Sequence, residues 1–351
     1  MKNVLILFGG KSSEYEVSLL SAFSVITKIP KDKYSVTLMG ITKDGRWLLF
    51  EDDINMIPNG EWINGKCTPA AISTDFGEKC INVFRASGIE KIAVDVVFPV
   101  LHGKNGEDGT VQGLLDLAGI PYVGCNTIAS AMCMDKAVTN MTADNAKISQ
   151  AKWLGITKSD YYEDKEAFAD NCAEYLGLPV FIKPANAGSS VGISKAKTKE
   201  DIFEAMEIAF REDYKVVAEE NIDGREVECA VLGNDKPIAS VIGEILPANE
   251  FYDYEAKYIN AASKLCIPAD LPEELSEKIR TLAIKSYKAL GCTGLSRVDF
   301  FVRRSDNAVL LNEINTLPGF TSISMYSKLF EAFGIPYEEL VDRLINLALE
   351  R

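Results

Sequence analysis

The chain has 351 residues, of which 47% are hydrophobic and 25% are charged, and its net charge is -14. This length is enough to bury two or three separate cores. The acidic balance argues against a nucleic-acid or anionic-membrane surface, because such surfaces depend on clustered basic side chains. The eight cysteines include no C-x-x-C pair and the chain has one histidine, so a zinc site is not indicated.

The compartment is expected to be the cytoplasm. Scattered cysteines in a chain of this size are typical of a reducing environment. The apolar run at 4–8 stops at Gly9 and is too short for a secretory signal. No apolar run reaches the length of a transmembrane helix, so no membrane partner is predicted.

The first part of the chain alternates strand and helix patterns. Residues 3–8 form a continuous apolar run, which is typical of a buried parallel strand. A helix is expected at 17–29, and further strands at 35–41 and 93–101. Together these predict a doubly wound α/β half-fold, with 51–90 as a surface excursion containing short strands.

The pattern changes after a junction near 125–135, where helices and antiparallel strands follow. Residues 246–263 lack periodicity over a length that suggests a functional loop or lid. The other expected elements are helices at 135–147, 165–176, 199–211, 272–290 and 337–350, and strands at 179–184, 190–195, 215–220, 225–233, 237–245, 294–303 and 308–314.

Two glycine-containing loops follow strands of the first part. The Gly9-Gly10 pair could direct backbone N–H groups at an anion or could be a plain strand–helix turn. A P-loop is excluded because Leu5 stands where its first glycine belongs, and the G-x-G-x-x-G spacing also fails. The loop 101–109 holds three glycines, two acids and His102, which is either a ligand-facing or a packed side chain.

The sharpest local signal is the segment 181–192, FIKPANAGSSVG. Lys183 ends an apolar strand, and a loop with two glycines and two serines leads to the next strand. A lysine supplies a point charge for phosphate, and the loop supplies N–H and hydroxyl donors. The segment therefore predicts a phosphate-binding strand–loop–strand, with a simple hairpin as the alternative.

Acidic side chains dominate two later segments. The turn at 219–226 offers carboxylates that could accept hydrogen bonds from adenine and ribose, although a solvated turn would look the same. On the last two strands, Arg297 alternates with Asp299, and Glu313 alternates with Asn315, so each pair shares a face. Hard oxygen ligands on neighbouring strands suit Mg²⁺, while a polar outer sheet face is the alternative.

Seven strings in this order resemble the D-alanine–D-alanine ligase family of the ATP-grasp superfamily: FGGKSSEYEVS, LHGKNGEDG, CMDK, FIKPANAGSSVG, FYDYEAKY, SRVDFF and NEINTLPGFTS. The match runs from about residue 3 to 330. The resemblance implies an α/β (α+β) ATP-grasp fold with an N-terminal Rossmann-like domain. It implies a substrate domain at 1–126, a central ATP-grasp subdomain at 127–218 and a catalytic C-terminal subdomain at 219–351.

The resemblance also implies a reaction. ATP phosphorylates the carboxylate of one D-alanine, and the amine of a second D-alanine attacks the acylphosphate to give the dipeptide used for peptidoglycan. The family uses two Mg²⁺ ions, which Mn²⁺ can replace, and a homodimer is expected.

Residue roles follow from the same resemblance. The metal ligands would be Asp299, Glu313 and Asn315. ATP would be held by Lys136, Lys183, Ser189, Ser190, Glu219, Glu220, Ile222, Glu226, Lys257 and Asn312. The substrates would be bound by Glu14, Val17, His102, Tyr258, Arg297, Gly319, Ser324 and Met325. The catalytic group would comprise Glu14, Ser189, Tyr258, Arg297, the Gly319 N–H and Ser324.

Three alternatives remain at this point. A D-alanine–D-serine or D-alanine–D-lactate ligase is the near one, although Tyr258 and the apolar Met325 favour D-alanine. A non-catalytic nucleotide-binding protein on the same fold is less favoured, because the metal-binding residues and the arginine are all present. A dehydrogenase is least favoured, because the dinucleotide fingerprint fails.

Overall fold

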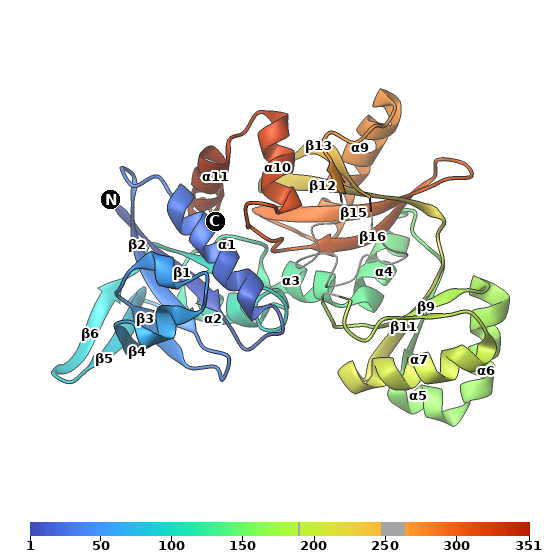
Figure 1. Cartoon of the computed structure of the whole chain (residues 1–351), viewed down its shortest axis with the longest axis horizontal. Helices are drawn as coiled ribbons and strands as arrows, with labels where there is room; N and C mark the ends of the chain where they lie inside the picture. Colours follow the sequence, from blue (N-terminus) through green and yellow to red (C-terminus); the bar gives the residue numbers. More distant parts are fainter. Residues whose placement is uncertain (189, 247–263) are drawn as a thin grey trace.

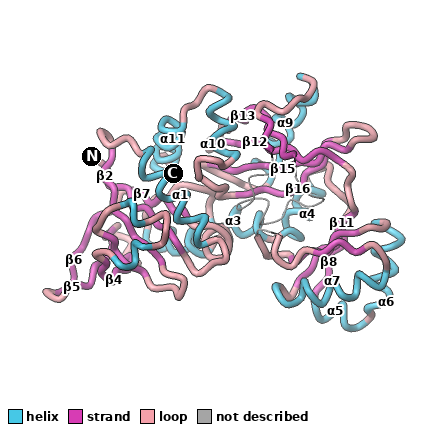
Figure 2. Tube along the Cα trace, viewed as in Figure 1, coloured by secondary structure: helices cyan, strands magenta, loops and turns pink. Residues whose placement is uncertain are grey.

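The computed structural model describes residues 1–188, 190–246 and 264–351. Its strands form three sheets of seven, four and five strands, which follow one another along the chain. Helices pack against each sheet, and the three groups of strands are separate in space (Figures 1 and 2). The mixed α/β architecture expected from the sequence is confirmed.

The seven-stranded sheet begins the chain and has the order β6-β5-β4-β3-β2-β1-β7. Three of its strands are parallel: β1 (Lys2–Gly9) lies between β2 (Tyr34–Ile41) and β7 (Val96–Val100). Helix α1 (Tyr15–Lys28) packs on β1, and α2 (Thr110–Ala118) follows β7. The carboxyl ends of β1 and β7 therefore meet at one edge, where the loops after them carry Glu14 and His102.

The doubly wound expectation was only partly right, because the excursion at 51–90 extends the same sheet. Its strands pair antiparallel, and its tryptophan, Trp62, is fully buried. A Cβ at Gly40 would lie 2.4 Å from the Trp62 ring, so a glycine on β2 leaves the space that this side chain fills. The added elements are β3 (Trp47–Phe50), η1 (Ile54–Met56), η2 (Glu61–Asn64), β4 (Cys67–Ile72), β5 (Cys80–Arg85) and β6 (Gly88–Ala93).

The four-stranded sheet is antiparallel and has the order β10-β9-β11-β8. The predicted strand at 190–195 begins later, at Ser194, because the preceding loop turns through left-handed backbone at Ser190 (φ 60°) and Gly192 (φ 74°). The elements are β8 (Trp153–Thr157), α5 (Lys158–Glu163), α6 (Lys165–Asn171), the π-helical η3 (Cys172–Leu176), β9 (Val180–Pro184), β10 (Ser194–Ala196), α7 (Lys199–Glu212) and β11 (Lys215–Glu220).

The five-stranded sheet is antiparallel, with the order β14-β13-β12-β15-β16. Helices α9 and α10 both contact β13 and β12 but pack in different apolar clusters, so the two faces of the sheet are covered separately. The elements are α3 (Thr127–Met134), α4 (Lys136–Asn145), β12 (Gly224–Leu232), β13 (Ile238–Leu246), β14 (Lys264–Cys266), α9 (Glu273–Ala289), β15 (Leu295–Arg303), β16 (Val309–Asn315), α10 (Met325–Phe333) and α11 (Tyr337–Leu349).

The apolar cores do not follow the order of the sheets. One cluster joins β1, β7 and α1 of the first sheet to β12, α10 and α11 near the end of the chain. Figure 1 shows α11 beside α1, and the two helices are in contact. The four-stranded sheet instead has a cluster of its own, formed with α5, α6 and α7. The first and last parts of the chain thus share a core, and the central part has a separate one.

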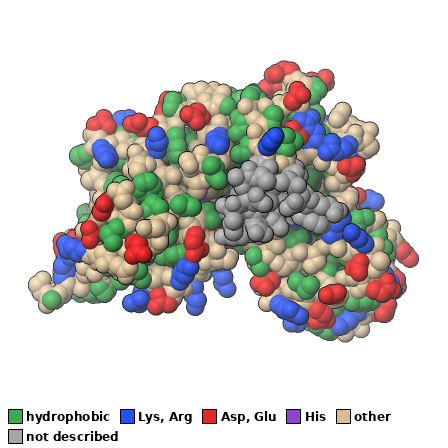
Figure 3. Space-filling view, in the orientation of Figure 1, with side chains coloured by type: hydrophobic (Ala, Val, Ile, Leu, Met, Phe, Trp, Pro, Cys, Tyr) green, Lys and Arg blue, Asp and Glu red, His purple; other side chains and the backbone are tan. Residues whose placement is uncertain are grey.

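The visible surface carries acidic and basic side chains side by side. On the face shown in Figure 3, the described acidic and basic side chains are interspersed rather than gathered by sign. Within the described ranges, no helix combines the length and the apolar character needed to cross a bilayer.

Candidate active site

The last two long strands bring four predicted side chains together by their register. Arg297 on β15 lies opposite Asn315 on β16, and Asp299 lies opposite Glu313. On the other side of β15, Glu228 of β12 lies opposite Asp299. Since residues two apart on a strand share a face, the pairing places all five polar groups on one face of the sheet.

Arg297 is held by two carboxylates. Its Nε and Nη2 atoms donate to the two oxygens of Asp299 at 2.8 and 2.7 Å, and Nε lies 3.0 Å from Glu228 Oε2. Burial alone would lower the pKa of Arg297, but Asp299 and Glu228 raise it well above its usual value. The guanidinium is therefore a fixed positive charge in a largely buried position.

The donor set on this face fits Mg²⁺. Two carboxylates, Asp299 and Glu313, stand opposite each other, and the Asn315 amide lies on the same face. Mg²⁺ commonly binds one or two carboxylates and fills its remaining positions with water and phosphate oxygens. Within the described residues, no three His, Cys, Asp or Glu side chains are grouped as metal ligands, so the predicted set takes the Asn315 amide as its third protein donor.

A buried ion pair stands in the central sheet. Lys183 is the second-last residue of β9, and its Nζ atom donates to Glu219 Oε2 of β11 at 2.6 Å. Burial lowers the pKa of Lys183, but Glu219 outweighs this effect, and Glu313 and Glu226 raise the pKa further. The influence of Glu313 shows that the central lysine and the C-terminal acids act on one another electrostatically.

The loop after β9 is held from the start of α4. The Lys136 N–H donates to Ala185 O at 3.0 Å, and Lys136 Nζ donates to Ala187 O at 2.7 Å. The first residue of α4 thereby fixes the loop at two carbonyls. The predicted strand–loop–strand is present, with two lysines at its base, and phosphate binding by it stays a prediction.

Most of the other residues predicted to contact the nucleotide lie at the end of β11, in the turn after it and at the start of β12. Glu219 also accepts a bond from Asn140 Nδ2 at 3.3 Å, and Glu220 Oε1 accepts from the Lys152 N–H at 2.7 Å. Glu226, on β12, is half-buried and raises the pKa of Lys183. Two further predicted residues, Ile222 in the turn and Asn312 on β16, are also half-buried.

Glu14 lies where two loops meet. It precedes α1 and is 6% exposed. A Cβ at Gly103 would lie 2.3 Å from Glu14 Oε2, and one at Gly188 would lie 3.3 Å from it. Gly188 belongs to the loop after β9, so the central and N-terminal parts approach each other at this carboxylate. Val17, one turn further along α1, is buried.

His102 was predicted near the first substrate, and the structure engages both of its ring nitrogens within the protein. Nδ1 lies 3.1 Å from Leu317 O, and Nε2 lies 3.0 Å from Ser21 Oγ. Glu107 Oε1 is 3.5 Å from Nδ1, and burial raises the pKa of Glu107 to about 7. The imidazole therefore links the N-terminal part to the loop after β16.

That loop carries the remaining predicted groups. Ser324 Oγ accepts the Thr321 N–H at 2.9 Å, and a Cβ at Gly319 would lie 2.8 Å from the same oxygen. Gly319 thus brings its backbone close to the serine. Met325 begins α10, is 6% exposed and fills the space left by Gly243 on β13.

The anion-binding interpretation of the first glycine pair is wrong. The Gly9 N–H donates to Ser18 Oγ at 2.8 Å, and the Gly10 N–H donates to Ile41 O at 2.8 Å. A Cβ at Gly9 would lie 2.2 Å from Ile41 O, so this glycine permits a close strand-to-turn approach. The plain turn, which the sequence left open, is what the structure shows.

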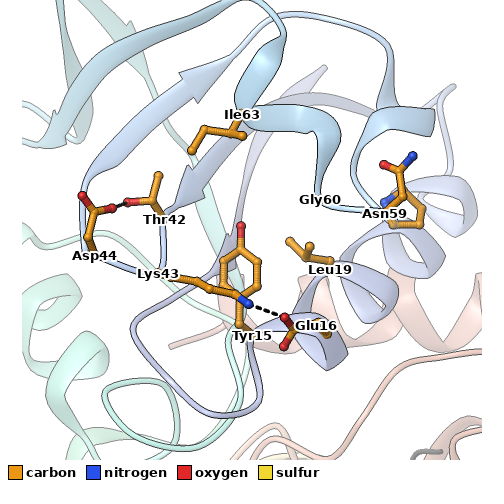
Figure 4. Close-up of a pocket in the computed structure, with 10 residues that line it drawn as sticks. Tyr15, Glu16, Leu19, Thr42, Lys43, Asp44, Asn59, Gly60 and Ile63 are labelled. Atoms are coloured by element: carbon orange, nitrogen blue, oxygen red, sulfur yellow. Dashed lines mark hydrogen bonds and ion pairs between the residues drawn. The ribbon is translucent and has the colours of Figure 1, made fainter.

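A groove of about 470 Å³ opens beside α1 (Figure 4). Its walls are the start of α1, the turn after β2 and the segment around Gly60. The Lys43–Glu16 ion pair crosses it. None of the predicted site residues lines this groove. The candidate active site is therefore identified from the positions of its side chains and not from this groove.

Sequence reasoning missed Ser21 and Glu228, and it named no role for Glu107. Ser21 lies within an ordinary helix pattern, and Glu228 lies in an apolar strand. Neither residue therefore stands in a loop motif that would mark it in the sequence. Three predicted residues, Ser189, Lys257 and Tyr258, lie outside the described part of the chain.

Comparison with known proteins gives consistent matches over the whole chain. The family model "D-ala D-ala ligase N-terminus" matches residues 3–125, and "D-ala D-ala ligase C-terminus" matches residues 142–346. A D-alanine–D-alanine ligase of Acetivibrio thermocellus is 53% identical, over 100% of this chain and 96% of the relative. One of Ruminiclostridium cellulolyticum is 50% identical, with the same coverage.

Solved structures agree. The VanG D-Ala:D-Ser ligase from Enterococcus faecalis has a TM-score of 0.90 and 41% identity, covering 99% of both chains. The D-alanine–D-alanine ligase from Coxiella burnetii has a TM-score of 0.86 and 35% identity, covering 100% of this chain and 96% of that one.

Proposed function

The chain belongs to the D-alanine–D-alanine ligase family, and from this premise we propose that it joins two D-alanines at the expense of ATP. The family makes this dipeptide for peptidoglycan. The observation that carries the proposal is the convergence of Arg297, Asp299 and Glu313 on one sheet face, within electrostatic reach of Lys183.

In the first step the carboxylate of one D-alanine attacks the γ-phosphorus of ATP, and ADP leaves. Lys136 and Lys183 would contact the phosphates, since both lysines stand at the base of the loop after β9. Glu219, Glu220, Ile222 and Glu226 would hold adenine and ribose, together with Asn312 and Ser190. Ser189 and Lys257, which lie outside the described residues, keep their proposed ATP roles.

Asp299, Glu313 and Asn315 would hold Mg²⁺, for which Mn²⁺ can substitute. Bound there, two metal ions would neutralise charge on the transferring phosphoryl group. The protein's own contribution is a cluster of carboxylates that outnumbers Arg297 and so favours a divalent cation at this face.

In the second step the amine of another D-alanine attacks the carbonyl carbon of the acylphosphate. The carbonyl oxygen becomes an oxyanion, the C–O bond to phosphate breaks, and the amine loses its proton. Arg297 and the Gly319 N–H would stabilise the oxyanion by donating hydrogen bonds to it.

The substrates would be held by the N-terminal part and by the start of α10. Glu14, nearly buried beside Gly103 and Gly188, would bind the ammonium of the first D-alanine, with Val17 against its methyl group. The carboxylate of the second D-alanine would lie at Ser324. Tyr258 keeps its proposed role of linking the lid loop to Glu14.

D-alanine is proposed as the second substrate as well. Met325 is apolar and buried, which suits a methyl better than a hydroxymethyl side chain. The D-Ala:D-Ser ligase with the similar fold is 41% identical to this chain, whereas relatives named D-alanine–D-alanine ligase reach 53%.

The division into 1–126, 127–218 and 219–351 remains part of the proposal, as do a homodimer and a cytoplasmic location. The three sheets support the division, although β11 continues to Glu220.

Product analysis tests the function directly. Purified protein with ATP, Mg²⁺ and D-alanine alone should release ADP and phosphate and form D-alanyl-D-alanine, identified by mass spectrometry. The panel should include D-serine and D-lactate with D-alanine. A product dominated by either mixed species would reassign the second substrate, and absence of any product would refute the proposal.

A further inference from the structure

We propose that Ser21 is a positioning residue which, together with His102, clamps the loop 317–320 so that the Gly319 N–H points at the reacting carbonyl. The inference rests on the proposed function, because it assigns the groups that hold one of its oxyanion donors in place. Ser21 itself touches neither substrate in this proposal and acts through the loop.

The clamp has two backbone contacts that flank Gly319. On one side, His102 Nδ1 lies 3.1 Å from Leu317 O. On the other, the Phe320 N–H donates to Ser21 Oγ at 3.2 Å. The 3.0 Å contact between Ser21 Oγ and His102 Nε2 closes the circuit. A loop fixed at both ends of a four-residue span has little freedom to rotate the peptides between those ends.

The hydrogen bonds of this circuit run in one direction, because the chemistry of each atom decides whether it donates or accepts. A carbonyl oxygen only accepts, so Nδ1 carries the proton toward Leu317 O. Ser21 Oγ already accepts the Phe320 N–H, and its own hydrogen can then be given to Nε2. Each of the three contacts then has one donor and one acceptor, and Glu107 Oε1 lies 3.5 Å from the same Nδ1 atom.

Burial makes the circuit strong. Ser21 is 0% exposed and His102 is 3% exposed, so solvent does not compete for these hydrogen bonds. Phe320 adds an anchor, because its ring packs against Phe98 of β7 with centroids 5.7 Å apart. The N-terminal part of the chain therefore holds this loop together with β16, whose Asn315 Oδ1 accepts the Leu317 N–H at 3.1 Å, and α11, whose Tyr337 hydroxyl donates to Phe320 O.

The position of Ser21 couples two parts of the proposed chemistry. It lies on α1, the helix that Glu14 precedes, so one rigid element carries both the proposed ammonium ligand and the clamp. The first substrate and the Gly319 N–H are placed relative to each other through about two turns of helix. This arrangement fixes the oxyanion donor relative to the substrate that generates the oxyanion.

The clamp should matter for the second chemical step and not for substrate binding. The oxyanion exists only after the amine attacks, so loss of its donor geometry affects the transition state of that step. Formation of the acylphosphate depends on the phosphate contacts and should be spared. A merely structural role would weaken both steps together.

The test is Ser21→Ala in the full-length protein, with steady-state kinetics and positional isotope exchange within ATP. We expect dipeptide kcat to fall about tenfold or more, since a misplaced oxyanion donor loses part of its effect. The KM for ATP and the D-alanine-dependent isotope exchange should stay within about twofold of wild type, because acylphosphate formation precedes the affected step.

Ser240→Ala is the matched control. Ser240 is also 0% exposed and also bridges two backbone groups, the Ala230 N–H at 3.0 Å and Val241 O at 2.6 Å. It should lower the melting temperature about as much as Ser21→Ala while leaving kcat unchanged. An equal loss of kcat in both variants would overturn the clamp.

A second variant, His102→Asn, retains a donor near Leu317 O but removes the contact with Ser21. If the two residues act as one unit, the double variant should be no slower than the slower single variant. Fully multiplicative losses, or an unchanged kcat in Ser21→Ala, would overturn the inference while wild type still makes dipeptide. A wild type without dipeptide synthesis would instead refute the proposed function and, with it, this inference.

Discussion

The C-terminal sheet and the N-terminal loops build their parts of the site in different ways. On β15 and β16, Arg297, Asp299, Glu313 and Asn315 stand where strand register places them. At the edge of the N-terminal sheet, His102 reaches its position through side-chain contacts with Leu317 and Ser21. The first arrangement is fixed by a backbone ladder, and the second depends on individual hydrogen bonds.

This difference indicates which substitutions should remove only the chemistry of one side chain and which should also displace its neighbours. A side chain on a paired strand can be removed while the backbone that carried it stays in place, so its loss reports its chemistry. A side chain that holds a loop has no such support, and its loss moves other groups. The following predictions compare these two kinds of residue, beginning with the largest expected effect.

Arg297→Ala should lower kcat about 100-fold or more, because it removes a fixed oxyanion donor while β15 keeps its register. Steady-state kinetics should show a much smaller change in KM. Arg303→Ala is the control, since Arg303 lies on the same strand and pairs with Asp306 at the surface. A loss confined to KM would contradict the oxyanion role.

Asp299→Asn should weaken Mn²⁺ binding about tenfold or more, because one of two carboxylate ligands loses its charge. Electron paramagnetic resonance with ADP present would measure free and bound Mn²⁺. The control Asp306→Asn changes an exposed carboxylate at the end of the same hairpin. Unchanged Mn²⁺ affinity would remove Asp299 from the metal site.

Lys183→Ala should weaken ATP binding about tenfold, as expected for one charge-assisted contact to phosphate. Isothermal titration calorimetry gives the affinity without turnover when D-alanine is omitted. Lys199→Ala on α7 is the control, because Lys199 pairs with Glu166 and Asp170 away from the loop. Equal affinities for wild type and Lys183→Ala would argue against the phosphate contact.

The Glu107→Gln variant tests the hydrogen-bonded region around His102 through the pH dependence of the free energy of unfolding. The pKa of Glu107 is raised, mainly by burial, from 4.5 to about 7, so the folded state binds its proton more tightly than the unfolded state. This contribution to the free energy of unfolding is present below pH 4.5 and is lost as the pH rises through about 7.

The Glu107→Gln substitution should therefore reduce the loss of free energy of unfolding between pH 5 and pH 8 by on the order of 1 kcal/mol. Urea unfolding at both pH values would measure it. Glu274→Gln, at an exposed position of α9, is the control. Parallel pH profiles for wild type and Glu107→Gln would show that Glu107 titrates alike in the folded and unfolded states.

The same contrast explains what the sequence could reveal. Alternation along 294–303 correctly predicted that Arg297 and Asp299 share a face, because a strand has a fixed period of two. The contacts of His102 could not be predicted, since its partner Leu317 lies 215 residues away. The roles assigned to these residues remain predictions.

The fold shows a similar limit. Continuous apolar runs identified the buried strands β1 and β7, but the excursion at 51–90 was placed on the surface. Trp62 is buried there because Gly40, on a strand distant in sequence, leaves room for its ring. Local patterns do not encode such complementary shapes. Several elements with weak periodicity, including α3, α10 and β8, also went unpredicted.

The distribution of apolar cores has a mechanical consequence. Because α11 and α10 pack with α1 and β7 in one cluster, the parts that carry Glu14 and Arg297 cannot separate without exposing a continuous apolar interior. The central sheet has a cluster of its own and a smaller one with Ala137 of α4, and a Cβ at Gly188 in its loop would lie 3.3 Å from Glu14. The parts that carry Glu14 and Arg297 are therefore held together by shared apolar contacts, in which none of the described residues of the central sheet takes part.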